Sequence, residues 1–328
     1  MTMRRVEISG PKPKVNQTLG ICAKTIHAAT NFLNTSGKSP TILMKCSRNL
    51  GDTLHMLPII KHYRLQYPDA IIAFITSQLY SGVHELNQDI SPGGLFLLPN
   101  NLSPQDRLKL WPIVHTSKVD IKIVPAIFPF GQVHECNKWC HEIIGDQYLW
   151  NAGIKGLQPL GGKRYLIPIK QEDIDWAREF IIKNNLDIDK CVMLEYRSMT
   201  HLSISRLCVM LEYRSYSHKE PWSRSQWSSF IKRTPERQFI GIAGQHELPI
   251  PGMIDGRGAT WRQTVALANI IPYMIGIGSG VTMLAAGAEH CPKIIEMGVS
   301  KSISMKACGY ADSVSCNVDE TDLKRYLL

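Results

Sequence analysis

Residues 41 to 77 carry the pattern that most restricts the fold of this chain. An apolar run, TILMKC, is followed by the loop SRNLGD, a helical pattern and a second apolar run, AIIAFIT. Two buried strands around one helix within about 35 residues have the size of a βαβ unit, whose strands are parallel. Parallel sheets need helices on both faces, so the chain is expected to fold as an α/β protein.

The pattern continues and divides the chain in two. Runs at GLFLLP and VDIKIVPAIF extend a first sheet, and a stretch rich in Gly and Pro over residues 153 to 170 is typical of a linker. Strands and helices then alternate again. We therefore predict two Rossmann-like, doubly wound domains that hold a ligand between the carboxyl ends of their strands. The expected parts are an N-terminal extension (1–40) with a short helix near 23–33, a first domain (41–160) and a second (161–328).

A short tandem duplication interrupts the second series. The octapeptide CVMLEYRS occurs at 191–198 and again at 208–215. One pair of copies is far from a repeat architecture, so only one copy is expected in the sheet. The second is the preferred functional copy, because Lys219 and Trp222 follow it directly.

Composition limits the class of protein and its partners. The 328 residues are 44% hydrophobic, without a secretory signal or a run of apolar residues long enough to span a membrane. The nine scattered cysteines suggest reduced thiols, and thus a soluble cytoplasmic protein. A formal charge of +9 favours an acidic partner, which could be nucleic acid, an anionic membrane surface or a phosphorylated substrate. Since no nucleic-acid-binding motif accompanies the charge, nucleic acid is the weakest of these interpretations.

Asp52 stands at the carboxyl end of the first predicted strand, where α/β sheets hold their ligands. Asp is also a preferred helix N-cap, and position alone favours a cap over catalysis. Pro58 disfavours a regular helix through the turn that follows.

A glycine-rich turn offers a second candidate. In GIGSGVTMLAAGA, residues 276–288, a predicted strand enters a Gly-Ser-Gly turn and a helix. The backbone and first amides of such a turn suit a phosphate, and the hydroxyls of Ser279 and Thr282 could add donors. An empty strand-to-helix turn explains the glycine spacing equally well.

Two further features are weaker. Lys219 in YSHKEPWSRSQW could place a positive charge near a phosphate, although a solvated lysine is the commoner case. The segment VHECNKWCH could supply His134, Cys136, Cys140 and His141 to zinc, but its cysteine spacing is unlike that of zinc sites. We therefore predict no metal site.

Four motifs together resemble glycosyltransferase family 9, the ADP-heptose:lipopolysaccharide heptosyltransferases. They are RNLGDTLHMLPIIKHYRLQYPDA, HKEPWSRSQW, FIGIAGQHE and IGIGSGVTMLAAGA, in family order over roughly residues 41 to 300. The resemblance implies a GT-B fold with an interdomain active site, no metal or other cofactor, and an inverting transfer of heptose from ADP-heptose to a sugar hydroxyl of the lipopolysaccharide core. It implies acceptor binding by the N-terminal domain and nucleotide-sugar binding by the C-terminal domain.

The resemblance also assigns roles to residues. Asp52 matches the general base, and Lys219 matches a lysine that contacts phosphate. Glu247 in GQHE matches a position near the nucleotide, and the donor diphosphate would bind at the turn formed by Gly278, Ser279, Gly280, Val281 and Thr282. A positively charged chain suits an acidic glycan or glycolipid acceptor, with peripheral contact at the inner membrane surface.

The turn departs from the family pattern. The family has an Asp-Ser-Gly turn followed by a histidine, whereas this chain has Gly278 and Met283 at the corresponding positions. These losses, with the duplication, keep a second hypothesis open: a weakly active or inactive relative that binds nucleotide or glycan.

Overall fold

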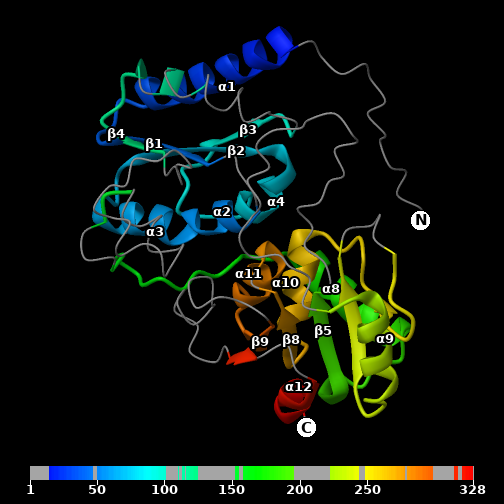
Figure 1. Cartoon of the computed structure of the whole chain (residues 1–328). Helices are drawn as coiled ribbons and strands as arrows, with labels where there is room; N and C mark the ends of the chain where they lie inside the picture. Colours follow the sequence, from blue (N-terminus) through cyan, green and yellow to red (C-terminus); the bar gives the residue numbers. More distant parts are fainter. Residues whose placement is uncertain are drawn as a thin grey trace, which may run out of the picture.

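Two parallel α/β domains make up the described part of the protein, one above the other in Figure 1. The computed structural model describes residues 15–46, 50–100, 110, 113–114, 116–124, 152–154, 158–195, 222–243, 248–277, 279–297, 314–316 and 320–327. Within these residues no helix is both long and apolar enough to cross a membrane. The predicted pair of Rossmann-like domains is confirmed, and the expected boundary near residue 160 falls between the two sheets.

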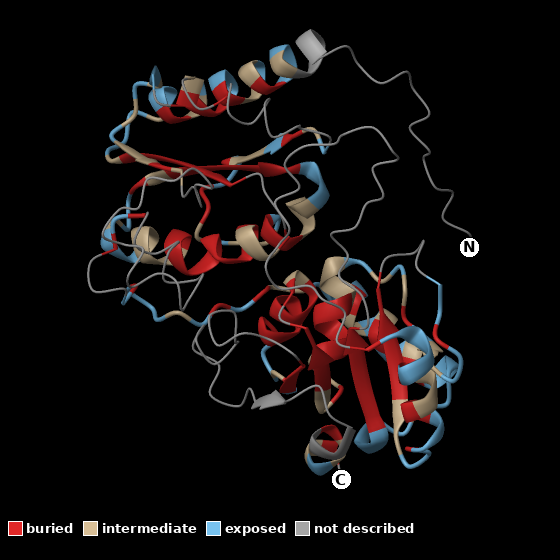
Figure 2. Ribbon diagram, in the orientation of Figure 1, coloured by how far each residue is buried: buried red, intermediate tan, exposed pale blue. Residues whose placement is uncertain are grey.

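The first sheet has the strand order β3-β2-β1-β4. Its strands are β1 (Thr41–Cys46), β2 (Ile71–Ser77), β3 (Leu95–Leu98) and β4 (Ile121–Ile123), and all of their pairings are parallel. Every residue of β1 is buried, because helices cover both faces of the sheet (Figures 1 and 2). The four strands predicted from apolar runs are therefore confirmed.

Helix α1 (Val15–Thr35) covers one face of this sheet and is longer than the helix expected near 23–33. Its apolar residues recur at helical spacing, and Cys22, Ile26, Ala29 and Leu33 pack in one cluster with β1 and β2 side chains such as Leu43, Ala73 and Ile75. Because this stripe is fully buried, α1 belongs to the core of the first domain. The expected extension over residues 1–40 is corrected to that extent.

The opposite face is covered by α2 (Leu50–Leu54) and α3 (Met56–Gln66), with η1 (Gln78–Tyr80) and α4 (Ser81–His84) nearby. The helix breaks between Leu54 and Met56, and Pro58 lies in the first turn of α3. Proline has no N–H to donate to a carbonyl one turn earlier, so the predicted irregularity here is confirmed.

The second sheet has the order β10-β9-β8-β5-β6-β7, again with parallel pairings. Its strands are β5 (Cys191–Glu195), β6 (Gln238–Ile242), β7 (Ile254–Asp255), β8 (Tyr273–Gly276), β9 (Lys293–Met297) and β10 (Val314–Cys316). The helices are α8 (Gln171–Lys183), α9 (Arg224–Lys232), α10 (Trp261–Ala268), α11 (Gly280–Ala286) and α12 (Glu320–Leu327), with η3 (Ile188–Lys190) before β5. The strands and helices predicted for the second half are confirmed.

The first copy of the duplicated octapeptide occupies the sheet. Residues 191 to 195 form β5, which pairs with β6 on one side and β8 on the other. The sequence left open which copy lies in the sheet, and the preference for the second copy as the functional one stays a prediction. The second copy itself, 208–215, lies outside the described residues.

Polar contacts join the two domains beside an apolar interface. Trp261 Nε1 donates to Leu79 O at 2.8 Å. Arg262 forms ion pairs with Asp173 of its own domain, Nε to Oδ2 at 3.0 Å, and with Glu85 of the first domain, Nη1 to Oε2 at 2.9 Å. Because the guanidinium is largely buried between two carboxylates on different domains, it fixes α10 against α4.

Replacing Arg262 should weaken the protein through this interface. We expect Arg262→Ala to lower the free energy of unfolding by about 2 kcal/mol, because it leaves the nearly buried Asp173 carboxylate without its charged partner. Urea denaturation provides the measurement. Arg178→Ala is a matched control, since its ion pair with Asp175 is exposed and should change stability by less than about 0.5 kcal/mol. Equal effects of the two substitutions would contradict the role of Arg262.

Candidate functional site where the two domains meet

The strand order of each sheet reverses at one point. In the first sheet β1 lies between β2 and β4, and in the second β5 lies between β6 and β8. Open α/β sheets hold ligands at the carboxyl ends of the strands at such switch points. Helix α2 follows β1 and helix α11 follows β8, so the segments that leave the two switch points are those predicted to carry Asp52 and the glycine-rich turn.

These two segments touch. A Cβ atom added to Gly280 would lie 2.8 Å from Leu50 Cβ and 3.0 Å from the backbone nitrogen of Gly51. A Cβ atom added to Gly51 would lie 3.2 Å from Met283 Sδ. Glycine at both positions therefore lets α2 and α11 approach at backbone distance. The structure thus brings the Asp52 segment and the 279–282 turn into contact.

Asp52 lies in the first turn of α2 and is partly exposed. The helix begins at Leu50, two residues earlier, so Asp52 is part of the helix and is not its N-cap. The interpretation as a cap is corrected. A carboxylate in a first helical turn is still favoured by the helix dipole, while its partial exposure leaves it accessible from solvent.

A buried polar cluster supports the residue that follows Asp52. Thr53 Oγ1 lies 3.0 Å from Thr76 Oγ1 and 3.2 Å from His84 Nε2. The His84 ring packs edge-on against Phe74, with centroids 4.7 Å apart, and its Nδ1 makes no hydrogen bond. Complete burial lowers the pKa of His84 to about 3, so the ring is neutral at physiological pH. Sequence reasoning missed this cluster, because His84 and Thr76 stand far from Asp52 in the chain.

The hydroxyls of Ser279 and Thr282 already have an acceptor. Ser279 Oγ donates a hydrogen bond to Glu195 Oε1, and Thr282 Oγ1 donates to Glu195 Oε2 at 2.7 Å. Both hydroxyls thus have their one hydrogen engaged in this structure. Their role as donors to a diphosphate stays a prediction. Glu195 ends β5 at the switch point. Sequence reasoning missed Glu195, although a carboxylate at the end of an otherwise apolar strand is a signal that could have found it.

The rest of the turn is tightly packed. Ser279 caps α11 by accepting from the Val281 N–H at 3.1 Å, and Val281 is itself buried. A Cβ atom added to Gly276 would lie 2.2 Å from Thr282 Oγ1, so the side chain of Thr282 fills the space above this glycine. The backbone around Gly280 is the part of the turn that faces the other domain.

Several predicted positions lie outside the described residues. They are Lys219, Glu247 and Gly278, together with the cysteine-rich segment His134, Cys136, Cys140 and His141. In the described part of the chain no three His, Cys, Asp or Glu side chains are grouped so that they could hold a metal ion. The predicted absence of a metal stays a prediction.

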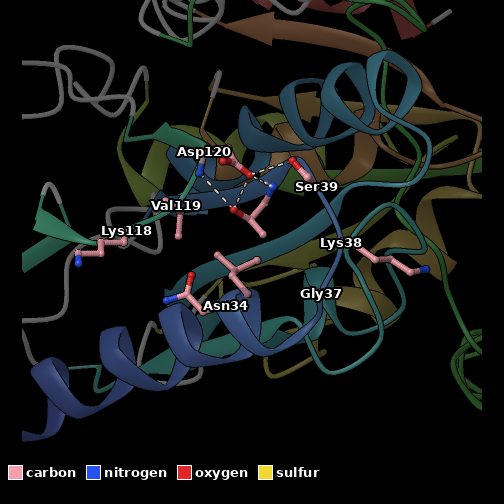
Figure 3. A pocket seen from close by; sticks show the side chains of 9 residues that line it. Asn34, Gly37, Lys38, Ser39, Lys118, Val119 and Asp120 are labelled. Carbon is pink, nitrogen blue, oxygen red and sulfur yellow. Dashed lines mark hydrogen bonds between the residues drawn. The ribbon is translucent and has the colours of Figure 1, made fainter.

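A hollow of about 510 Å³ lies elsewhere in the first domain (Figure 3). Its lining includes Asn34 in the last turn of α1, Lys38 after that helix and Lys118 before β4. Asp120 at its edge accepts hydrogen bonds from the backbone and hydroxyl of Thr41 at 2.7 and 2.9 Å, which lower the pKa of its carboxyl group. These residues lie at the amino ends of β1 and β4, opposite the edge where Asp52 lies. We therefore assign the hollow no part in the candidate site.

The neutrality of His84 should appear in the pH dependence of stability. The pKa of His84 in the folded protein is about 3, below its usual 6.5, so the unfolded chain binds the proton first. The stability contributed by the neutral ring is complete above about pH 6.5 and is lost as the pH falls toward 3, by up to about 1.4 kcal/mol per pH unit. Urea unfolding at several pH values should show a shallower decline for His84→Gln than for wild type. His290→Gln, at an exposed position, is the control, and an unchanged decline in His84→Gln would contradict the assignment.

Solved structures share this architecture. No protein-family model and no curated protein matches the sequence. A glycosyltransferase family 9 structure from Veillonella parvula DSM 2008 is similar with a TM-score of 0.60 and 14% identity, covering 85% of this chain and 86% of that one. The structure of E. coli ADP-heptose lipopolysaccharide heptosyltransferase II is similar with a TM-score of 0.57 and 11% identity, covering 88% and 96%. The chain therefore has the two-domain GT-B fold of these glycosyltransferases.

Proposed function

We propose that the protein is an inverting, metal-independent glycosyltransferase. It transfers a heptose or related sugar from a nucleotide-diphospho-sugar, ADP-heptose in the first instance, to a sugar hydroxyl of lipopolysaccharide core or a similar glycan. The observation that carries the proposal is the contact of the Asp52 segment with the 279–282 turn at the switch points of two Rossmann-like sheets. The likeness in fold to an ADP-heptose lipopolysaccharide heptosyltransferase supports the choice of donor and acceptor.

In the proposed reaction each part has one role. The acceptor hydroxyl attacks the anomeric carbon while Asp52 takes its proton, and the bond from that carbon to the diphosphate breaks with its electron pair on the leaving oxygen. Developing charge on the diphosphate needs a positive environment. The backbone at Gly280 faces the Asp52 segment, and Lys219 and Glu247 keep the roles toward phosphate and nucleotide that the resemblance implies.

The net positive charge supports the proposed acceptor and the proposed contact with a membrane surface. The formal charge of +9 suits a phosphorylated glycolipid acceptor and peripheral contact with an anionic inner membrane surface from the cytoplasmic side. We propose no nucleic-acid partner and no cofactor beyond the nucleotide-sugar.

A second candidate function has its own support. The hydroxyls of Ser279 and Thr282 are held by Glu195, and Met283 stands where the family has a histidine. A protein that binds nucleotide or glycan without turnover would account for both. Mass spectrometry of reactions with a panel of nucleotide-sugars and core acceptors separates the two, because only a transferase releases the nucleotide and lengthens the glycan.

The base is tested by Asp52→Asn, which keeps the size of the side chain and removes the proton acceptor. We expect kcat to fall by roughly 10²- to 10⁴-fold, the usual contribution of a general base, with ADP affinity changed by less than about threefold. Asp69→Asn, at an exposed turn, is the control and should keep full activity. Normal turnover by Asp52→Asn with the true donor and acceptor would show that Asp52 is not the base.

A further inference from the structure

Glu195 is a carboxyl group with no exposure to solvent, at the end of β5. It accepts hydrogen bonds from Ser279, from Thr282 and, at 3.5 Å, from the backbone N–H of Ile277. All three donors belong to the segment that leads from β8 into α11. One buried carboxyl group therefore ties the end of β8 and the start of α11 to the end of β5.

The surroundings of Glu195 contain further acid. Ile242 on β6 lies beside Glu195 across the sheet. On the other side, Leu194 pairs with Ile275 of β8, so the next residue of that strand, Gly276, is level with Glu195. Gly276 pairs in turn with Glu296 on β9, which is also fully buried. Residues in register on parallel strands point to the same face, so both glutamates lie beneath α11. The sheet register therefore places a second buried acid, Glu296, on the same face as Glu195.

While Glu195 is ionised, its hydrogen bond with Ser279 keeps the Ser279 hydroxyl from donating to a ligand. Ser279 Oγ accepts from Val281 and gives its one hydrogen to Glu195, so it has none for a ligand. If Glu195 takes up a proton, its O–H can donate to Ser279 Oγ, and the hydrogen of Ser279 becomes available. Thr282 is completely buried, whereas Ser279 is 5% exposed and is the hydroxyl that can turn outward.

We propose that Glu195 is a positioning residue for donor binding: it takes up a proton from solvent when the nucleotide diphosphate binds, and so releases the Ser279 hydroxyl to the diphosphate. This inference rests on the proposed function, since it requires a diphosphate at the turn. Burial raises the pKa of Glu195 against the opposing effect of its hydrogen bonds to Ser279 and Thr282, which favours proton uptake. A nearby diphosphate would raise the pKa further, because like charges disfavour ionisation.

Calorimetry of ADP binding tests the proposal between about pH 5 and pH 8. Titrations in buffers of different ionisation enthalpy give the number of protons taken up. We expect wild type to take up as much as one proton per ADP more than Glu195→Gln, whose amide is neutral at every pH. Kd of wild type should rise by up to about tenfold per pH unit above the pKa of Glu195, whereas Kd of Glu195→Gln should change only with the titration of ADP itself.

Two neighbouring variants serve as controls. Glu296→Gln removes the buried acid of β9 and Glu172→Gln removes an exposed carboxylate from α8, and both should keep the wild-type proton uptake. Should Glu195→Gln fail to fold by circular dichroism, Ser279→Ala decides the question. Its ADP affinity should be roughly fivefold weaker than that of wild type at low pH and equal to it at high pH, where Glu195 holds the hydroxyl.

The outcomes separate the two proposals. Proton uptake and pH dependence that are the same in Glu195→Gln and wild type, or a loss in Ser279→Ala that does not change with pH, would overturn the role of Glu195 and leave the transferase proposal intact. Failure of wild type to bind ADP at any pH would overturn the proposed donor and this inference with it.

Discussion

The contact between α2 and α11 at Gly51 and Gly280 is the constraint on which the rest of the structure depends. Each helix leaves the switch point of its own sheet, and the absence of a side chain at both glycines lets the two backbones meet. Apolar side chains from both domains, including Leu54, Val83 and Leu284, then pack in one common cluster. This packing sets the position of Asp52 relative to the glycine-rich turn, since Asp52 follows Gly51 directly and Gly280 is part of the turn.

The second domain places an acid where a phosphate-binding turn would be expected to offer only donors. The resemblance had indicated the loss of an acidic residue from the turn at Gly278. The structure has a carboxyl group close by, since Glu195 reaches the turn from the adjacent strand β5. A buried carboxyl group fixes the turn firmly, yet it competes for the hydroxyl hydrogens that a ligand would use. The hydrogen bonds of Glu195 therefore support the fold and also occupy the hydroxyls of Ser279 and Thr282. In our proposal, protonation of Glu195 releases the Ser279 hydroxyl to the ligand.

Local pattern predicted most of the elements because each sheet is covered on both faces. Strands such as β1 and β5 read as continuous apolar runs, and their helices carry apolar stripes at helical spacing. The same reasoning recognised the segments of Asp52 and of Ser279. It failed for α1, whose apolar stripe begins earlier than the predicted helix, and for Asp52 as a cap, because Leu50 and Gly51 ahead of Asp52 already belong to the helix.

The sequence by itself determined the fold class with its two domains, and it singled out the segments of Asp52 and of the glycine-rich turn, since apolar periodicity and glycine placement are local properties. Only the tertiary structure decided which copy of CVMLEYRS became β5. Both copies carry the same side chains, and the backbone just ahead of the first copy is held by residues next to and within β6: the Asp187 N–H donates to Gln238 Oε1, and Arg237 Nη1 donates to Asp189 O. Only the tertiary structure joined Glu195 to Ser279 and Thr282, more than 80 residues away. Hydrogen bonds across such separations depend on strand order, which no local pattern contains.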